Sequence, residues 1–182
     1  MVVFLGTWAT IIALGATLAG VIVHLRSPRG LFDALTAHGL LPASLVRPVS
    51  IAVPVAETGL GLAGCAALIL GMTTVKLAVM AALAVLFAGY AGYLYRVAST
   101  GRDVPCGCSL SREPVNGWTV TRAASFGIAA LIAAATTPIV SAPTDVASWA
   151  VLAPAAATTL LLLWTLPAAM RQFDTRGVRW TS

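Results

Sequence analysis

Charged residues are scarce in this chain: they make up 9% of its 182 residues, whereas 59% are hydrophobic. A soluble domain usually carries about 25% charged residues, and a soluble chain with so few could not cover its surface with polar groups. A lipid bilayer must therefore replace water around much of the protein. The length predicts one membrane domain that covers residues 1–182.

Lysine is nearly absent, because Lys76 is the only one among the 11 basic residues and all the others are arginines. The basic residues flank apolar runs and do not form a cluster among aromatic residues, which argues against nucleic-acid binding. A composition rich in Arg and Ala suggests a bacterial protein with a GC-rich genome. No Lys or Arg precedes the first apolar run, as it would in a signal peptide, so we expect this run to stay as a transmembrane helix.

Five apolar runs are long enough to cross a bilayer, which takes about 20 helical residues. They predict an all-α, polytopic transmembrane bundle. The predicted spans are residues 4–23, 49–70, 74–95, 118–139 and 146–169, followed by a tail over 170–182. The connection at Gly71 is short, which makes the second and third helices antiparallel neighbours.

A short amphipathic helix is predicted over residues 28–38, lying on the membrane surface. Ser27 can cap this helix and Pro28 suits its first position, while Gly39 and Pro42 are stop signals. An ordered loop is the alternative for this segment.

Small residues within the second and third spans are expected to let helices pack closely in lipid. They are Gly59, Gly61, Gly64, Gly89 and Gly92.

The basic residues also predict the orientation of the bundle in the membrane. With five crossings, residues 24–48, residues 96–117 and the C-terminal tail share one side. Counting Arg122 with its loop, this side holds every arginine: Arg26, Arg29, Arg47, Arg96, Arg102, Arg112, Arg122, Arg171, Arg176 and Arg179. The other side holds only Lys76, so the positive-inside rule places the arginines in the cytoplasm. We expect a multi-pass protein of the bacterial plasma membrane, with the N-terminus outside and the C-terminus and the 96–117 loop inside.

Two of the three cysteines stand one residue apart, in the sequence Cys106-Gly107-Cys108. Two thiols at this spacing can close a small disulfide ring that departs from relaxed geometry, and strained, accessible disulfides tend to be labile or catalytic. Arg102 and Arg112 flank the pair, and nearby cations stabilise thiolates. The pattern predicts a redox pair.

Other interpretations of the cysteines stay open. The pair could be structural, or it could bind zinc together with His24 and His38, although the spacing is not that of a zinc finger and no metal is predicted. Cys65 lies mid-helix among small and apolar residues, which indicates a buried hydrophobic role, with a third redox thiol as the alternative.

Glu57 is the only acidic residue well inside an apolar run. A carboxylate there is costly unless it is protonated or paired, and such residues are functional candidates. Arg122 lies at a similar depth on the same side, and His24 ends the first span there. We expect Glu57 to pair with Arg122, or with His24 as the alternative, beneath the cysteine loop. Such a pair could also serve helix packing alone.

These features together resemble the MauE family, within the DoxX-like group of small membrane proteins. The resemblance rests on His24 at the end of the first helix, the segment His38-Gly39-Leu40-Leu41-Pro42, the stretch PVAETGLGL with Pro54 and Glu57, and CGC followed by WTVTR. It covers roughly residues 5–140. The family usually has Cys-Gly-Cys-Phe-Gly, whereas Ser109 and Leu110 follow here, although both thiols remain.

The resemblance implies a four-helix DoxX-like core, with the fifth helix outside it, and a role in thiol redox or in maturing exported proteins. In methylamine-utilising bacteria the family is linked to maturation of the disulfide-rich small subunit of methylamine dehydrogenase, beside a thioredoxin-like partner. The disulfides of exported proteins form outside the cytoplasm, whereas the charge distribution places the 96–117 loop inside it. We favour a route in which electrons pass from cytosolic thiols across the membrane, as in DsbD or CcdA. A quinone could instead take them within the bilayer, or the topology could be reversed.

We therefore predict a membrane thiol–disulfide oxidoreductase in which Cys106 and Cys108 cycle between dithiol and disulfide. Cys106 would attack, while Glu57 and Arg122 position the loop or relay a proton. Two alternatives remain: a structural or accessory subunit of a larger membrane complex, and a transporter in which the cysteines capture a soft metal ion.

Overall fold

The computed structural model describes residues 1–107, 114–139 and 143–177, with side-chain surroundings up to residue 170. The regular structure of these residues is helical. The helices are α1 (Val2–Arg26), α2 (Gly30–His38), α3 (Ala43–Ile69), α4 (Thr73–Ala98), α5 (Gly117–Thr136) and α6 (Val146–Gly177). All except α2 are long and apolar enough to cross a membrane. The predicted all-α, polytopic bundle is confirmed.

Each predicted span corresponds to one long helix, with shifts at the ends. The largest shift is at the end of α6, which continues to Gly177, eight residues beyond the predicted end at residue 169 and into the predicted tail. The next largest is in α3, which begins at Ala43 with Pro42 at its N-cap, six residues before the predicted start at residue 49. Pro42 itself is extended, with ψ 140°, and its missing backbone N–H leaves no unpaired donor at this boundary. The helix α5, by contrast, is shorter than its predicted span, which ended at residue 139, because it ends at Thr136, just before Pro138.

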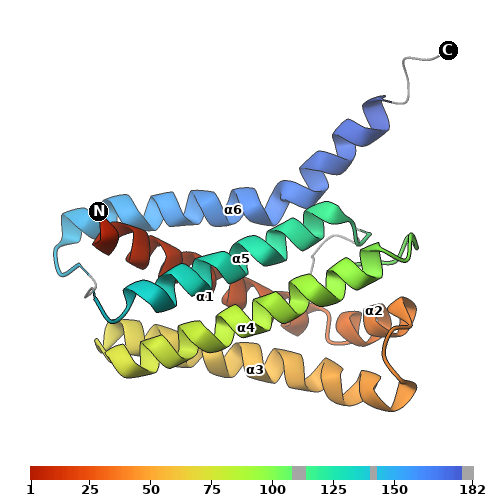
Figure 1. Cartoon of the computed structure of the whole chain (residues 1–182), viewed down its shortest axis with the longest axis horizontal. Coiled ribbons are helices and arrows are strands. Elements are labelled where there is room, and N and C mark those ends of the chain that lie inside the picture. Colours follow the sequence, from red (N-terminus) through yellow and green to blue (C-terminus); the bar gives the residue numbers. More distant parts are fainter. Residues whose placement is uncertain (108–113, 140–142, 178–182) are drawn as a thin grey trace.

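The helix α1 runs through the interior of the bundle, and α3, α5 and α6 pack against it (Figure 1). Its buried positions include Ile12, Ala13 and Thr17. The helix α4 packs along α5 and also contacts α3. Successive spans alternate in direction, so α2 and the connection before α5 lie at one end, whereas the N-terminus and the link between α5 and α6 lie at the other (Figure 1). Which end faces the cytoplasm stays a prediction from charge.

The predicted short helix after the first span is confirmed as α2, and the loop alternative is wrong. Its start differs from the expectation: Arg29 is the N-cap, and Ser27 contributes its backbone oxygen, which accepts from the Gly30 N–H at 2.9 Å. Gly39 ends the helix with φ 65°, a left-handed conformation that favours glycine. The apolar side of α2 lies against α3, where Leu35 joins a buried cluster with Val46.

The glycines of α3 and α4 fall into two groups. A Cβ atom at Gly61 would lie 3.1 Å from Leu18 Cδ2, and one at Gly64 would collide with Leu14 Cδ2. These two glycines therefore let α3 approach α1 closely, as predicted. Around Gly59, Gly89 and Gly92, by contrast, a Cβ would meet nothing within 4 Å, so the packing role predicted for these three is wrong.

Candidate functional site

Cys106 lies in the connection between α4 and α5 and is buried, with 3% of its surface exposed. The base of this connection is closed by an antiparallel bridge between Pro105 and Pro114, and the Val115 N–H donates to the Val104 oxygen at 2.9 Å. The structure thus holds Cys106 at the α2 end of the bundle. Its predicted partner Cys108 lies outside the described residues, as does the flanking Arg112.

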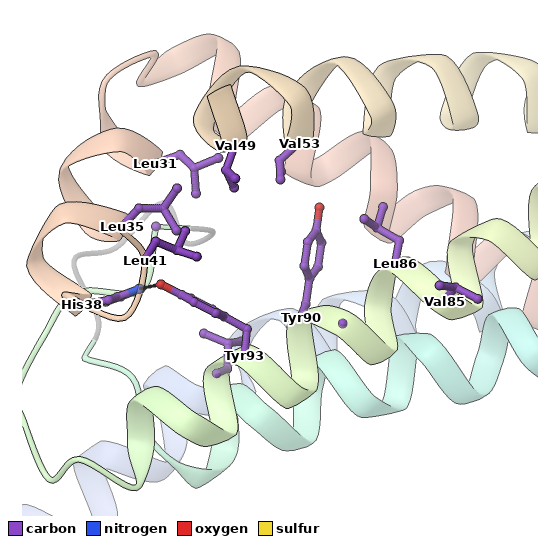
Figure 2. A pocket seen from close by; sticks show the side chains of 13 residues that line it. Leu31, Leu35, His38, Leu41, Val49, Val53, Val85, Leu86, Tyr90 and Tyr93 are labelled. Atoms are coloured by element: carbon purple, nitrogen blue, oxygen red, sulfur yellow. Dashed lines mark hydrogen bonds between the residues drawn. The ribbon is translucent and has the colours of Figure 1, made fainter. Parts of the chain in front are cut away.

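His38, the last residue of α2, anchors the residue before Cys106. Its Nε2 is 2.9 Å from the Pro105 oxygen, and its Nδ1 is 3.0 Å from the Tyr93 hydroxyl on α4 (Figure 2). A carbonyl oxygen can only accept, so Nε2 carries the hydrogen and the Tyr93 hydroxyl donates to Nδ1. Burial lowers the pKa of His38, and the bond to Pro105 offsets this only in part, which favours the neutral ring.

This anchoring role was missed from the sequence, where His38 entered only the zinc alternative and the family motif. The sequence feature that pointed to this role was the position of His38 directly before Gly39, the residue that ends the helix.

Arg122 lies beneath the cysteine loop, as expected. It projects from the second turn of α5 and is buried. Its Nη2 lies 3.9 Å from Cys106 Sγ. Its guanidinium also stacks on the Trp164 ring of α6, 5.3 Å from the ring centroid, and its Nη1 is 3.5 Å from the Trp164 backbone oxygen. A cation this close to a sulfur stabilises the thiolate form of the cysteine.

Glu57 pairs with His24, so the preferred pairing with Arg122 is wrong and the alternative is correct. Glu57 Oε2 lies 3.3 Å from His24 Nε2, and the Tyr90 hydroxyl donates to Oε1 at 3.0 Å. Within the described part of the chain, His24 is the residue that pairs with Glu57. The reason is geometric: α1 comes close to α3 at Gly20, where a Cβ would lie 3.1 Å from Oε2, whereas Arg122 is directed at Cys106 and Trp164.

The contact between Glu57 and His24 is close but poorly aligned. Despite the 3.3 Å separation, neither Glu57 Oε2 nor His24 Nε2 has a hydrogen-bond partner among the described residues. A buried polar atom without a partner is costly. Glu57 also lines a cavity of about 40 Å³ with Tyr90, Arg122 and Trp164, which exceeds the roughly 10–15 Å³ that one water needs. Glu57 and Arg122 thus face a shared, water-sized space.

The remaining predicted residues are not brought to this site. Cys65 is partly buried in α3 and packs against the main core cluster, about 12 Å along the helix beyond Glu57 at 1.5 Å per residue. His24 and His38 have different partners, and within residues 1–107, 114–139 and 143–170 no three His, Cys, Asp or Glu side chains gather in a way that could hold a metal ion.

A family model described as "Methylamine utilisation protein MauE" matches residues 1–136. This stretch comprises α1 to α5 and includes Glu57, Cys106 and Arg122, while α6, with Trp164, lies beyond it. The extent agrees with the resemblance predicted over roughly residues 5–140. No curated protein and no solved structure matches the chain. Since the match covers well over half of its length, this chain belongs to the MauE family of membrane proteins.

Proposed function

We propose that this MauE-family membrane protein transfers thiol–disulfide redox equivalents for the maturation of exported proteins, with Cys106 and Cys108 as the redox pair. The observation that carries the proposal is the placement of Cys106. It is buried, its sulfur lies 3.9 Å from Arg122 Nη2, and His38 holds the residue before it. A purely apolar burial of the thiol would need neither the cation nor the anchor.

The exchange follows ordinary thiol–disulfide chemistry. A thiolate of a partner dithiol attacks the Cys106–Cys108 disulfide, and a mixed disulfide forms as the bond between the two cysteines breaks. The second partner thiol then attacks the mixed disulfide, so the partner leaves oxidised and the pair is left as two thiols. Two electrons and two protons move to Cys106 and Cys108. The reverse sequence, in which Cys106 attacks, reduces the partner.

Arg122 acts on the sulfur, because its guanidinium stabilises Cys106 as an attacking or leaving thiolate. Its orientation depends on Trp164, whose ring and backbone oxygen hold the guanidinium from α6. In this proposal Arg122 is therefore both the electrostatic partner of Cys106 and a link between the family-matched region and the last helix.

Glu57 supplies the proton relay. Its carboxylate has contacts to His24 and Tyr90 and faces the same 40 Å³ cavity as Arg122. A water in that cavity would connect the buried carboxylate to the cation beneath the cysteine loop. Buried ionisable groups of this kind within membrane spans commonly serve proton relays.

The test replaces each cysteine by serine and measures the redox state of exported proteins in cells. We expect C106S and C108S to change the disulfide content of at least one exported client, and C65S, a matched control in α3, to leave it unchanged. Client proteins that stay unchanged in C106S and C108S, with the membrane protein present at normal levels, would refute the redox role. Stable co-purification with another membrane protein in those variants would then favour the accessory-subunit alternative.

A further inference from the structure

An apolar cavity of about 410 Å³ lies between α2, α3 and α4. In Figure 1, α3 and α4 lie close together at their short link and diverge towards the end where α2 packs. Aliphatic side chains from all three helices form the walls, among them Leu31, Val53 and Leu86 (Figure 2). The volume is in the range of roughly 300–1,000 Å³ that is typical of sites for small molecules.

The polar groups of the cavity wall are already used inside the protein. The Tyr90 hydroxyl donates to Glu57 Oε1 at 3.0 Å. The Tyr93 hydroxyl donates to His38 Nδ1, and His38 Nε2 donates to the Pro105 oxygen. No Asp, Glu, Lys or Arg is among the lining residues. The cavity therefore suits a hydrocarbon chain and not a ligand that needs hydrogen bonds within it.

The cavity opens on the outer surface of α4. Val85 lines the cavity and is 75% exposed. Gly89, one turn further along, also lines it, and a Cβ there would meet nothing within 4 Å. Both α3 and α4 are long and apolar enough to cross a membrane, so their outer surface faces the hydrocarbon of the bilayer. The acyl chain of a membrane lipid can enter such an opening directly from the bilayer.

Two arginines lie at the α2 end of this cavity. Arg96 follows Gly89 by seven residues, which places it two turns further along α4 on the same face, within about 20°. Arg102 comes from the connection after α4, and its Nη1 would lie 3.5 Å from a Cβ at Gly39. Gly39 directly follows His38, which lines the cavity. The apolar space thus ends beside cationic groups.

These two arginines are not neutralised by carboxylates in the part of the chain that the structure describes. The ion pair found there joins His24 to Glu57, and neither Arg96 nor Arg102 lies within ion-pair distance of an acidic side chain, although Asp103 is next in the sequence. Guanidinium groups bind phosphate with paired, charge-assisted hydrogen bonds. Basic pockets at the end of a transmembrane bundle bind anionic lipid headgroups in this way.

We propose that the cavity holds one acyl chain of an anionic phospholipid, whose phosphate is bound by Arg96 and Arg102. Such a lipid carries a hydrocarbon chain and an anionic group in the same relation as the apolar cavity and the arginines at its end. A zwitterionic lipid has the phosphate too, but its cationic group is repelled by the arginines. The bound chain contacts Gly107, which also lines the cavity, and so supports the segment that carries Cys106. Lipid binding here does not depend on the proposed thiol–disulfide function.

The position of the chain is tested by filling the cavity. The full-length protein is purified in mild detergent, and binding of phosphatidylglycerol is measured by native mass spectrometry. G89F places a ring in the cavity, and G92F is the matched control, because Gly92 is equally open but does not line the cavity. We expect G89F to weaken binding about tenfold or more and G92F to change it less than about twofold. G89L is the second variant if G89F does not elute as a folded species in gel filtration. Equal binding by wild type and the folded cavity variant would overturn the proposal.

The position of the phosphate is tested by the choice between two lipids. Phosphatidylglycerol and phosphatidylcholine with identical acyl chains are compared, and we expect wild type to prefer phosphatidylglycerol about tenfold. The double variant R96Q/R102Q should lose this preference. R47Q is the control, because Arg47 is an exposed arginine near the same end of the bundle, and its place in α3 turns it about 160° away from the cavity-lining Val49.

Three outcomes would overturn the lipid assignment. The first is equal binding of the two lipids by wild type. The second is a loss of preference in R47Q as large as that in R96Q/R102Q, which would show a general effect of positive charge. The third is a different apolar molecule that is extracted from purified wild type and is absent from G89F.

Discussion

Replacing His38 by phenylalanine should loosen the segment that carries Cys106. His38 donates to the Pro105 oxygen at 2.9 Å and accepts from the Tyr93 hydroxyl at 3.0 Å. Phenylalanine preserves a ring at this buried position and removes both hydrogen bonds. The bridge between Pro105 and Pro114 remains, so we expect local opening of the loop rather than unfolding of the bundle.

The magnitude follows from the two bonds. A hydrogen bond contributes about 0.5–1.5 kcal/mol net, so the loss of both lowers the free energy of loop opening by about 1–3 kcal/mol. Since about 1.4 kcal/mol corresponds to a tenfold change in an equilibrium, the open population should rise about 5- to 140-fold. The variant Y93F removes the bond from its hydroxyl to His38 and leaves the bond from His38 to Pro105, and loss of that one bond should raise the open population by about 2- to 12-fold on the same scale.

The assay is the rate at which an alkylating reagent modifies Cys106 in the reduced protein, resolved by peptide mass spectrometry. Cys65 in α3 serves as the internal reference, because it packs on the main core far from the loop, and its rate should stay constant. Cys106 rates that are equal in wild type and H38F, with an unchanged Cys65 rate, would refute the claim that His38 holds the loop. A Y93F effect as large as that of H38F would show that the Pro105 bond contributes little.

Three further predictions concern pH, packing and orientation. Because burial lowers the pKa of His38 below 6.5, the open loop binds more protons than the closed one, so closure should weaken as pH falls from 6.5 through the lowered value. Hydrogen exchange of the Val115 amide should show this weakening in wild type. An equal dependence of loop closure on pH in H38F would contradict the prediction. In α3, G64A should destabilise the protein by about 1–3 kcal/mol through overpacking, because its Cβ would collide with Leu14 Cδ2, whereas G59A should not; unfolding in mixed micelles measures both, and equal stabilities would count against the close approach of α1 and α3. Finally, a membrane-impermeant thiol reagent should label reduced Cys106 only after intact cells are opened. Labelling in intact cells would show that the topology is the reverse of the predicted one.

The five spans were predictable from the sequence because each must cover the hydrocarbon with its own apolar residues. This requirement acts within one segment and does not depend on its neighbours. The exact ends were less predictable, since local capping decides them. The early start of α3 after Pro42 carries the helix through Arg47 and Pro48, both of which lie before the predicted start at residue 49.

The candidate site was predictable in its composition and less so in its pairings. Cys106, Glu57, Arg122 and His24 stood out because thiols and ionisable groups are rare in apolar runs. Which of them touch depends on how the helices rotate about their axes, and this is set by packing. A close approach at Gly20 brings α1 to the carboxylate and selects His24, while Trp164 draws Arg122 towards α6.

The sequence by itself determined that this is a polytopic membrane protein that resembles the MauE family, and it predicted that the arginines and the Cys106-Gly107-Cys108 motif lie at one end. Hydropathy, charge and local motifs carry that information residue by residue. Only the tertiary structure decided that His38 anchors the residue before Cys106 and that Gly89 faces an apolar cavity and not a helix neighbour. The physical reason is that hydrogen bonds and cavities join residues far apart in the chain, and their meeting depends on how whole helices pack together.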